Sequence, residues 1–279
     1  MPKLKFSLDE LGVEIIFDPA GFRENPLDFP LFSRSAARKE IRGEAVLHLS
    51  RLASDQDPFP LIPGQDLPIQ VEREGNRLRF RSSGSRAEYD LKTRQGEIQA
   101  IPDRLSGSLE NFLRVIYSYF LLERGGVLLH AFGFAWKGSA HLLFGPSGSG
   151  KSTAADLFTG ILAGGDQGMI LSDDVIQVVA GEREGVFLAS RPQLEARLSP
   201  CDQRWPVQDA FLLVKNHRDF IIPSEPAVSI SRLLASVLYV SEDPETIPGL
   251  LGLLEKFVRA CPVGELHFQP DPDFFKLII

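Results

Sequence analysis

The sequence predicts an α/β protein in two parts, a β-rich region at residues 1–105 and a larger domain with a mixed sheet at residues 106–279. Three observations lead to this fold class. A glycine-rich loop at residues 145–152 lies between a strand pattern and a helix pattern. The strand patterns after this loop come in pairs joined by short turns, which is typical of antiparallel pairing and hence of a mixed sheet. Segments between residues 67 and 93 alternate apolar and polar side chains, as strands with one buried face do.

The composition limits the classes of protein to consider. The 279 residues are 43% hydrophobic and 24% charged, as in a globular protein with a substantial core. The net charge is −7 and Lys and Arg form no run, which argues against a dedicated nucleic-acid binder. No stretch approaches the roughly 18 apolar residues of a membrane span, and the first residues, MPKLKFSLDELG, lack the apolar core of a signal peptide. We therefore expect a cytoplasmic protein without a membrane partner.

The two cysteines, Cys201 and Cys261, lie far apart in the chain. Their spacing matches neither a metal site nor a disulfide framework, so both are predicted to be reduced and buried.

The first region contains turn signals but no cluster of reactive side chains. Residues 1–60 are irregular in pattern, with one strand predicted at residues 13–17. The segments LPIQVER, NRLRFRSS and AEYDLKT then alternate in polarity, and Gly75-Asn76 and Gly84-Ser85 lie between them. This arrangement predicts an antiparallel meander.

A helix and a hairpin are predicted before the glycine-rich loop. Ser106 or Ser108 can cap a helix whose apolar residues fall on one broad face. The segments GVLLHAFGFAW and SAHLLFG follow as two strands joined by Lys137-Gly138, and the second strand runs directly into the loop.

The loop satisfies the pattern G-x-x-x-x-G-K-[ST] at every fixed position, and a helical pattern, AADLFTGILAGG, follows it. Its residues are Gly145, Pro146, Ser147, Gly148, Ser149, Gly150, Lys151 and Ser152, with Thr153 next in the chain. The glycines allow successive backbone N–H groups to face phosphate oxygens, and the start of the helix adds a positive dipole end. Lys151 supplies a charge for the β- and γ-phosphates, and the Ser152 hydroxyl can join the shell of a Mg²⁺ ion. ATP with Mg²⁺ is therefore the predicted ligand.

Two carboxylates follow a short apolar strand about twenty residues further on, in the segment MILSDD that ends with Asp173 and Asp174. Beside a triphosphate, one carboxylate can hold Mg²⁺ and the other can take a proton from an attacking hydroxyl. The alternative is an Asp-rich turn that only caps the strand.

The block GVLLHAFGFAWKGSAHLLFGPSGSGKST, followed by LSDD, resembles the HPr kinase/phosphorylase family and its relatives with a phosphoenolpyruvate-carboxykinase-like nucleotide domain. The resemblance implies a mixed-sheet P-loop domain with a kinase activity. It implies that His130 is the active-site His, that residues 145–152 bind ATP, that Asp173 is the catalytic acid or base, and that Asp174 is the carboxylate on the metal side.

The chain departs from this family after the Asp pair. VFLASRPQLEAR stands where the bifunctional HPr enzymes carry a segment of the form LEIRGLGIINV. The expected phosphoacceptor is therefore a hydroxyl of another protein Ser or of a small molecule rather than HPr.

The remaining patterns complete the predicted domain. VIQVVAG with GVFLASRP, and FLLVKN with FIIPSEP, are predicted hairpins. Arg191 follows a strand, and we assign it to a phosphate oxygen. Helical patterns at residues 229–240 and 244–260 then lead to the strand ELHF.

Several functions stay open from the residues alone. A kinase uses Asp173, His130 and Lys151 together, whereas a non-catalytic ATP sensor or assembly factor needs only the loop. A transporter-type ATPase would need a signature segment that is not evident after the loop, and a carboxykinase would need Mn²⁺ ligands and an Arg set that are not evident either. The phosphoacceptor, ATP against GTP, the reverse reaction and homo-oligomerisation are not decided by the sequence.

Overall fold

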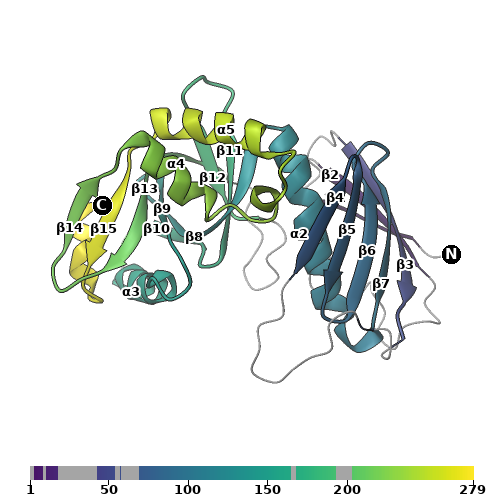
Figure 1. Cartoon of the computed structure of the whole chain (residues 1–279). Coiled ribbons are helices and arrows are strands. Elements are labelled where there is room, and N and C mark those ends of the chain that lie inside the picture. The colour runs from purple at the N-terminus through teal and green to yellow at the C-terminus, as the bar shows by residue number, and fades with distance from the viewer. Residues whose placement is uncertain are drawn as a thin grey trace. The chain divides into compact units, whose positions relative to one another are not determined.

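The computed structural model describes residues 3–8, 11–17, 43–53, 57, 69–164, 168–192 and 203–279. These residues form two compact units, one up to Phe120 and the other from Leu121 (Figure 1). The division falls near the C-terminal end of helix α2 (Leu105–Glu123), whereas the sequence places the domain boundary where this helix begins. Each unit is described by itself below.

The N-terminal unit is built on a seven-stranded sheet in the order β1-β2-β3-β7-β6-β5-β4. Its strands are β1 (Lys3–Leu8), β2 (Leu11–Phe17), β3 (Gly43–Arg51), β4 (Gln70–Glu74), β5 (Arg77–Ser82), β6 (Ser85–Asp90) and β7 (Gln95–Ala100). The predicted meander is confirmed, because β4, β5 and β6 pair antiparallel in chain order, and β7 extends it by a further antiparallel strand. The strand predicted at residues 13–17 lies within β2. The patterns missed β1, β3 and β7, and β3 pairs parallel to β2 and to β7.

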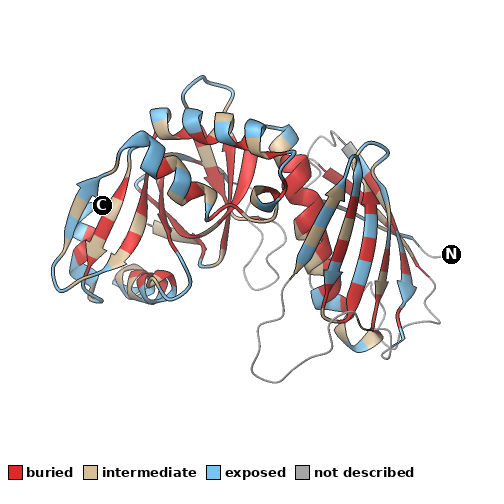
Figure 2. Cartoon of the chain, viewed as in Figure 1, coloured by how far each residue is buried: buried red, intermediate tan, exposed pale blue. Residues whose placement is uncertain are grey.

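Helix α2 covers one face of this sheet. The alternating strands turn Leu78, Phe80 and Tyr89 inward, where they are buried (Figure 2). Phe112 of α2 packs against them, with its ring centroid 5.5 Å from that of Phe80 and 6.3 Å from that of Tyr89. The helix begins at Leu105 after a 3₁₀ turn, η4 (Pro102–Arg104), so the predicted capping by Ser106 or Ser108 is wrong. The opposite face of the sheet is polar.

The C-terminal unit combines a mixed sheet with three α-helices. Its strands are β8 (Gly126–Trp136), β9 (Ser139–Phe144), β10 (Gly168–Ser172), β11 (Val175–Ala180), β12 (Phe187–Ser190), β13 (Trp205–Lys215), β14 (Phe220–Pro223) and β15 (Val263–Phe268). Its helices are α3 (Lys151–Ala163), α4 (Pro226–Leu234) and α5 (Ile247–Ala260), with 3₁₀ turns η5 (Val240–Glu242) and η6 (Pro272–Leu277).

The strands follow the order β10-β8-β11-β12-β13-β15-β14, and β9 pairs with both β8 and β13. These pairings close β8, β11, β12, β13 and β9 into a ring. Strand β13 runs parallel to β9 and to β15, and the other pairs in this unit are antiparallel.

Two of the three hairpins predicted for this unit are present, and the third is not. The hairpin of β8 and β9 is confirmed, and its turn residues Lys137 and Gly138 both have positive φ, 47° and 89°. The hairpin of β11 and β12 is also confirmed. The predicted hairpin of FLLVKN with FIIPSEP is wrong, because β14 pairs with β15, which comes from much later in the chain and also pairs with β13.

An aromatic core attaches α3 to the sheet. Phe158 of α3 lies with its ring centroid 4.3 Å from that of Phe134 on β8 and 5.3 Å from that of Phe275 in η6. Burying a side chain of this size stabilises the fold by roughly 1.5–3 kcal/mol. The packing therefore holds the N-terminal end of α3 at the end of β9.

A buried polar pair lies elsewhere in this unit. Nδ1 of His141 on β9 is 2.9 Å from Oδ1 and 3.1 Å from Oδ2 of Asp209 on β13. The bond joins the parallel strands β9 and β13, and both groups are buried and satisfied by each other. Cys261 is buried nearby, as predicted, and its Sγ donates to the Val207 carbonyl oxygen at 3.6 Å. Cys201 lies outside the described residues.

We expect Cys261 to be unreactive in the folded protein. Burial, and to a smaller extent the negative charge of Asp209, raises the pKa of its thiol to about 12. Because only the thiolate attacks, the reactive fraction at pH 8 falls roughly a thousandfold below that of an ordinary cysteine. A Cys201→Ser variant isolates Cys261 for titration with a disulfide reagent, with and without guanidinium. Slow labelling in buffer and fast labelling in denaturant are expected, and fast labelling of the native protein would contradict the assignment.

Candidate nucleotide-binding site

The glycine-rich loop connects the end of β9, at Phe144, to the start of α3, at Lys151. Gly145, Gly148 and Gly150 have φ angles of 150°, 79° and 111°, a region in which side chains are strained. A Cβ atom at Gly150 would lie 2.5 Å from Cζ of Phe268 on β15, which packs against the loop. The loop conformation thus depends on glycine both through the backbone angles and through this close approach.

A Gly150→Ala variant is expected to lose stability and nucleotide affinity together. The backbone strain and the contact with Phe268 predict a loss of about 1–3 kcal/mol in the free energy of unfolding, measured by chemical denaturation. Gly160→Ala is the matched control because Gly160 lies in α3 with nothing within 4 Å of its added Cβ. This control should gain about 0.5–1 kcal/mol from better helix propensity. A Gly150→Ala protein as stable as the wild type would contradict the assigned loop geometry.

The side chain of Lys151 curls back inside the loop. Its ammonium donates hydrogen bonds to the carbonyl oxygens of Gly145 at 2.7 Å and Pro146 at 3.1 Å. Lys151 is 6% exposed. Burial lowers the pKa of this ammonium from its ordinary value, and the negative charge of Asp174 opposes the shift. The positive charge is therefore held within the curve of the loop.

The hydroxyl groups of the loop differ in exposure. Ser147, Ser152 and Thr153 are exposed. The Ser149 hydroxyl is buried and has no hydrogen-bond partner in the part of the chain that the structure describes. A buried hydroxyl normally has a partner, so the loop contains an unused polar group beside the Lys151 charge.

The Asp pair lies in the tight turn between β10 and β11. The buried Ser172 Oγ accepts hydrogen bonds from the backbone N–H groups of Asp174 and Val175, each at 3.1 Å. This bonding shapes the turn and directs the two carboxylates differently. Asp173 is exposed. The negative charge of Asp174 acts on the Lys151 ammonium and partly offsets the lowering of the Lys151 pKa by burial.

His130 joins Asp174 through the pairing of β8 with β11. The register places His130 opposite Val175. Its Nδ1 lies 3.0 Å from the backbone oxygen and 3.2 Å from Oδ1 of Asp174. The structure therefore brings two of the predicted residues, His130 and Asp174, into contact, while Asp173 is exposed at the edge of the same turn. Lys151 is linked to Asp174 through the charge of this carboxylate.

Arg191, which is predicted to bind a phosphate oxygen, lies against the backbone of β10 in the structure. Its Nε donates to the Leu171 carbonyl oxygen at 2.7 Å, and its Nη2 donates to the Ile170 carbonyl oxygen at 2.6 Å. From the residue after β12 it thus fastens the last part of β10, immediately before the Asp turn. These two bonds position the turn, and the assignment of Arg191 to a phosphate oxygen stays a prediction.

Two features of the site had no clear signal in the sequence. Phe268, which limits the space at Gly150, belongs to a strand more than 100 residues later in the chain. The fastening role of Arg191 depends on where β12 lies relative to β10. A strand pattern was visible in both regions, but neither pattern indicates which loop or strand a side chain contacts.

A metal site made entirely of protein ligands is not found, since no three His, Cys, Asp or Glu residues cluster within the described ranges. Mg²⁺ does not require such a cage, because in phosphate sites it takes one or two protein oxygens together with phosphate and water. Asp174 and Ser152 are the protein oxygens available beside the loop.

No family model matches this chain, and no curated protein matches it. Among the described residues, no helix is both long and apolar enough to cross a membrane. The chemistry of the site is therefore argued from its own geometry.

Proposed function

We propose that this protein binds ATP with Mg²⁺ and transfers the γ-phosphoryl group to a hydroxyl of a protein Ser or a small molecule. The fold proposed for this activity is a mixed-sheet P-loop domain of the HPr kinase and phosphoenolpyruvate-carboxykinase-like type. The observation that carries the proposal is the glycine-rich loop with the Lys151 ammonium held inside it, on which the charge of Asp174, the partner of His130, acts.

The loop itself fits a triphosphate. The Lys151 ammonium, which now donates to two loop carbonyls, can donate to β- and γ-phosphate oxygens instead. The partnerless Ser149 hydroxyl and the backbone N–H groups at the start of α3 supply further donors. The α3 dipole adds a favourable field for negative charge at the loop, whereas the buried Lys151 ammonium is compensated by the two loop carbonyls and the negative charge of Asp174.

Asp174 and Ser152 are the residues that would hold Mg²⁺. When bound, the ion neutralises charge that develops on the phosphate oxygens. The contact of His130 Nδ1 with Asp174 keeps this carboxylate facing the loop, because a protonated Nδ1 donates to its oxygens.

Asp173 is the proposed general base. It is exposed at the turn, as a carboxylate must be if it is to approach a hydroxyl of an incoming acceptor. A positioned base accepts the hydroxyl proton as the oxygen attacks the γ-phosphorus, and the bond to the bridging oxygen of ADP breaks.

The test is a titration of the purified protein with ATP and Mg²⁺, followed by incubation with γ-labelled ATP and a cell extract. Magnesium-dependent binding and transfer of label to an acceptor would support the kinase proposal. Binding without transfer or hydrolysis would replace it with a non-catalytic ATP sensor. Absence of binding would overturn both, and a parallel titration with GTP measures the base preference.

A further inference from the structure

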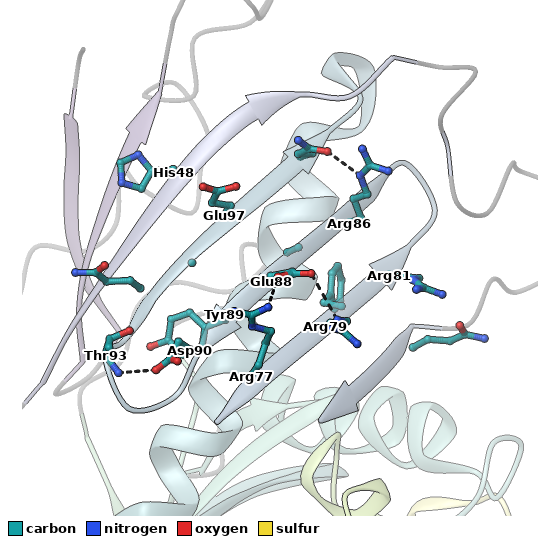
Figure 3. Close-up of a pocket in the computed structure, with 16 residues that line it drawn as sticks. His48, Arg77, Arg79, Arg81, Arg86, Glu88, Tyr89, Asp90, Thr93 and Glu97 are labelled. Atoms are coloured by element: carbon teal, nitrogen blue, oxygen red, sulfur yellow. Dashed lines mark hydrogen bonds and ion pairs between the residues drawn. The ribbon is translucent and has the colours of Figure 1, made fainter. Parts of the chain in front are cut away.

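The polar face of the N-terminal sheet, opposite α2, forms an open hollow of about 1120 Å³ (Figure 3). Side chains of β3 to β7 line it, and most are charged or carry amides. We call this surface the outer face. It belongs to the N-terminal unit alone and contains no residue of the nucleotide-binding loop.

The strand register arranges the outer face in rows that cross the sheet. One row contains Arg81 opposite Arg86, with Gln70 beside Arg81 and Gln99 beside Arg86. No carboxylate belongs to this row, which we call the arginine row. Like charges directly opposite each other on neighbouring strands destabilise a sheet. The fold therefore maintains an unfavourable pair of guanidinium groups on an exposed surface.

The next row is rich in carboxylates. It contains Glu72, Arg79, Glu88, Glu97 and His48 in register across the sheet. Glu88 is paired, since one of its oxygens lies 3.5 Å from Nε of Arg79 and the other lies 3.7 Å from Nη1 of Arg77. Glu97 faces Glu88 and forms no ion pair with any residue that the structure describes.

The outer face thus has uncompensated charges of both signs at a fixed separation. Arg86 donates from Nε to Oε1 of Gln99 at 2.7 Å, which orients its guanidinium but leaves its charge unbalanced. Glu97 and Gln99 are two residues apart on β7, so the carboxylate row and the arginine row lie roughly 7 Å apart.

The end of the β5–β6 hairpin that carries the arginines is held firmly. The Gly84 backbone N–H donates to Oδ1 of Asp57 at 2.8 Å, and Nη1 of Arg104 lies 2.8 Å from Oδ2 of the same carboxylate. Nη1 of Arg104 also donates to Oγ of Ser83 at 2.6 Å. The side chain of Asp57 is 4% exposed, so this connection is protected from solvent. Preorganised donors lose less entropy when they bind a ligand.

We propose that the outer face binds an extended polypeptide segment with alternating charge. An acidic side chain of this segment lies between Arg81 and Arg86, and a basic side chain two residues away lies over Glu97. In an extended chain such residues share one face and are about 7 Å apart, which equals the spacing of the two rows along the strands. Glu97 also lies one strand, roughly 5 Å, to the side of Arg86, and the long side chains of the arginine and of the basic residue span this offset. Guanidinium groups bind a carboxylate through paired hydrogen bonds.

The charge pattern favours a polypeptide over a nucleic acid. A nucleic acid presents negative charge continuously, and the carboxylates of the second row would repel it. The protein also has a net charge of −7, which disfavours long-range attraction of polyanions.

The experiment measures fluorescence anisotropy of labelled synthetic peptides with the full chain at low salt. The main probe repeats Thr-Glu-Thr-Lys over about twelve residues, and a scrambled peptide with its Glu and Lys in separate blocks is the comparison. The wild type should bind the alternating peptide at least tenfold more tightly than the scrambled one. The double variant Arg81→Gln with Arg86→Gln should remove this preference. Glu97→Gln should weaken binding of the alternating peptide and leave binding of the scrambled peptide unchanged.

A matched double variant controls for net charge. Arg183→Gln with Arg218→Gln removes the same two charges from exposed positions in the other unit and should leave peptide binding unchanged. An Arg81→Glu variant should raise the melting temperature by relieving the repulsion at Arg86, yet lose the peptide. Retained ATP binding, measured separately, distinguishes failure of this proposal from failure of the proposed kinase function. Equal binding of both peptides, tighter binding of a thymidine oligonucleotide, or unchanged binding by the arginine double variant would overturn the proposal.

Discussion

Replacing Lys151 with alanine is expected to weaken binding of ATP with Mg²⁺ by roughly 100-fold or more. Hydrogen bonds to a charged group contribute about 1.5–3 kcal/mol each, and Lys151 can form two with the phosphates. The free protein should tolerate the change, because burial already lowers the pKa of this ammonium and so disfavours its charged form. Isothermal calorimetry gives the affinity, and thermal denaturation without nucleotide gives the stability.

Lys256→Ala is the control for Lys151→Ala. Lys256 is an exposed lysine on α5, and its loss removes the same charge without touching the loop. Its ATP affinity should equal that of the wild type. If Lys151→Ala bound ATP as tightly as Lys256→Ala, the glycine-rich loop would not be a phosphate site.

The two aspartates of the β10–β11 turn are expected to separate into different roles when each is changed to asparagine. Asp173→Asn should bind ATP normally but transfer phosphate about 10²–10⁴-fold more slowly, because it removes only the proton acceptor. Asp174→Asn should slow transfer and also lower the Mg²⁺ dependence of binding, since the charge of Asp174 acts on Lys151 and its carboxylate contacts His130. Single-turnover transfer of labelled phosphate and ATP titrations at several Mg²⁺ concentrations distinguish the two.

A different pattern of effects would contradict the roles assigned to Asp173 and Asp174. A large loss of transfer in Asp174→Asn with unchanged Mg²⁺ dependence, and normal transfer in Asp173→Asn, would reassign the base to Asp174. Asp156→Asn provides a matched control, because Asp156 is an exposed carboxylate in the middle of α3. Its transfer rate should not change.

The proposed function and the outer face assign separate tasks to the two units. The C-terminal unit would carry out phosphoryl transfer, and the N-terminal unit would hold a charged segment of a polypeptide. The two proposals rest on different residues and are tested by different ligands, so either can fail without the other.

Local sequence patterns were sufficient to predict those features whose conformation depends on residues close together in the chain. The loop with Gly145, Gly148 and Gly150 is recognisable because positive φ angles require glycine at those positions whatever the rest of the fold does. The meander of β4 to β6 and the turn at Lys137-Gly138 follow in the same way from alternation and turn residues. Because these features depend on short-range sterics, the glycine-rich loop and the antiparallel pairs β4–β5, β5–β6, β8–β9 and β11–β12 could be predicted from the residues.

Other features required the tertiary structure because they join strands that are distant in the chain. His130 contacts Asp174 only because β8 pairs with β11 in one particular register, and Phe268 supports the loop only because β15 lies beside β13. The predicted hairpin of β13 with β14 failed for the same reason, since β15 takes the position between them. A strand pattern indicates which face of a strand is buried, but burial alone does not select the partner strand. Long-range pairing depends on how all the strands together bury their apolar faces, which is a property of the whole fold.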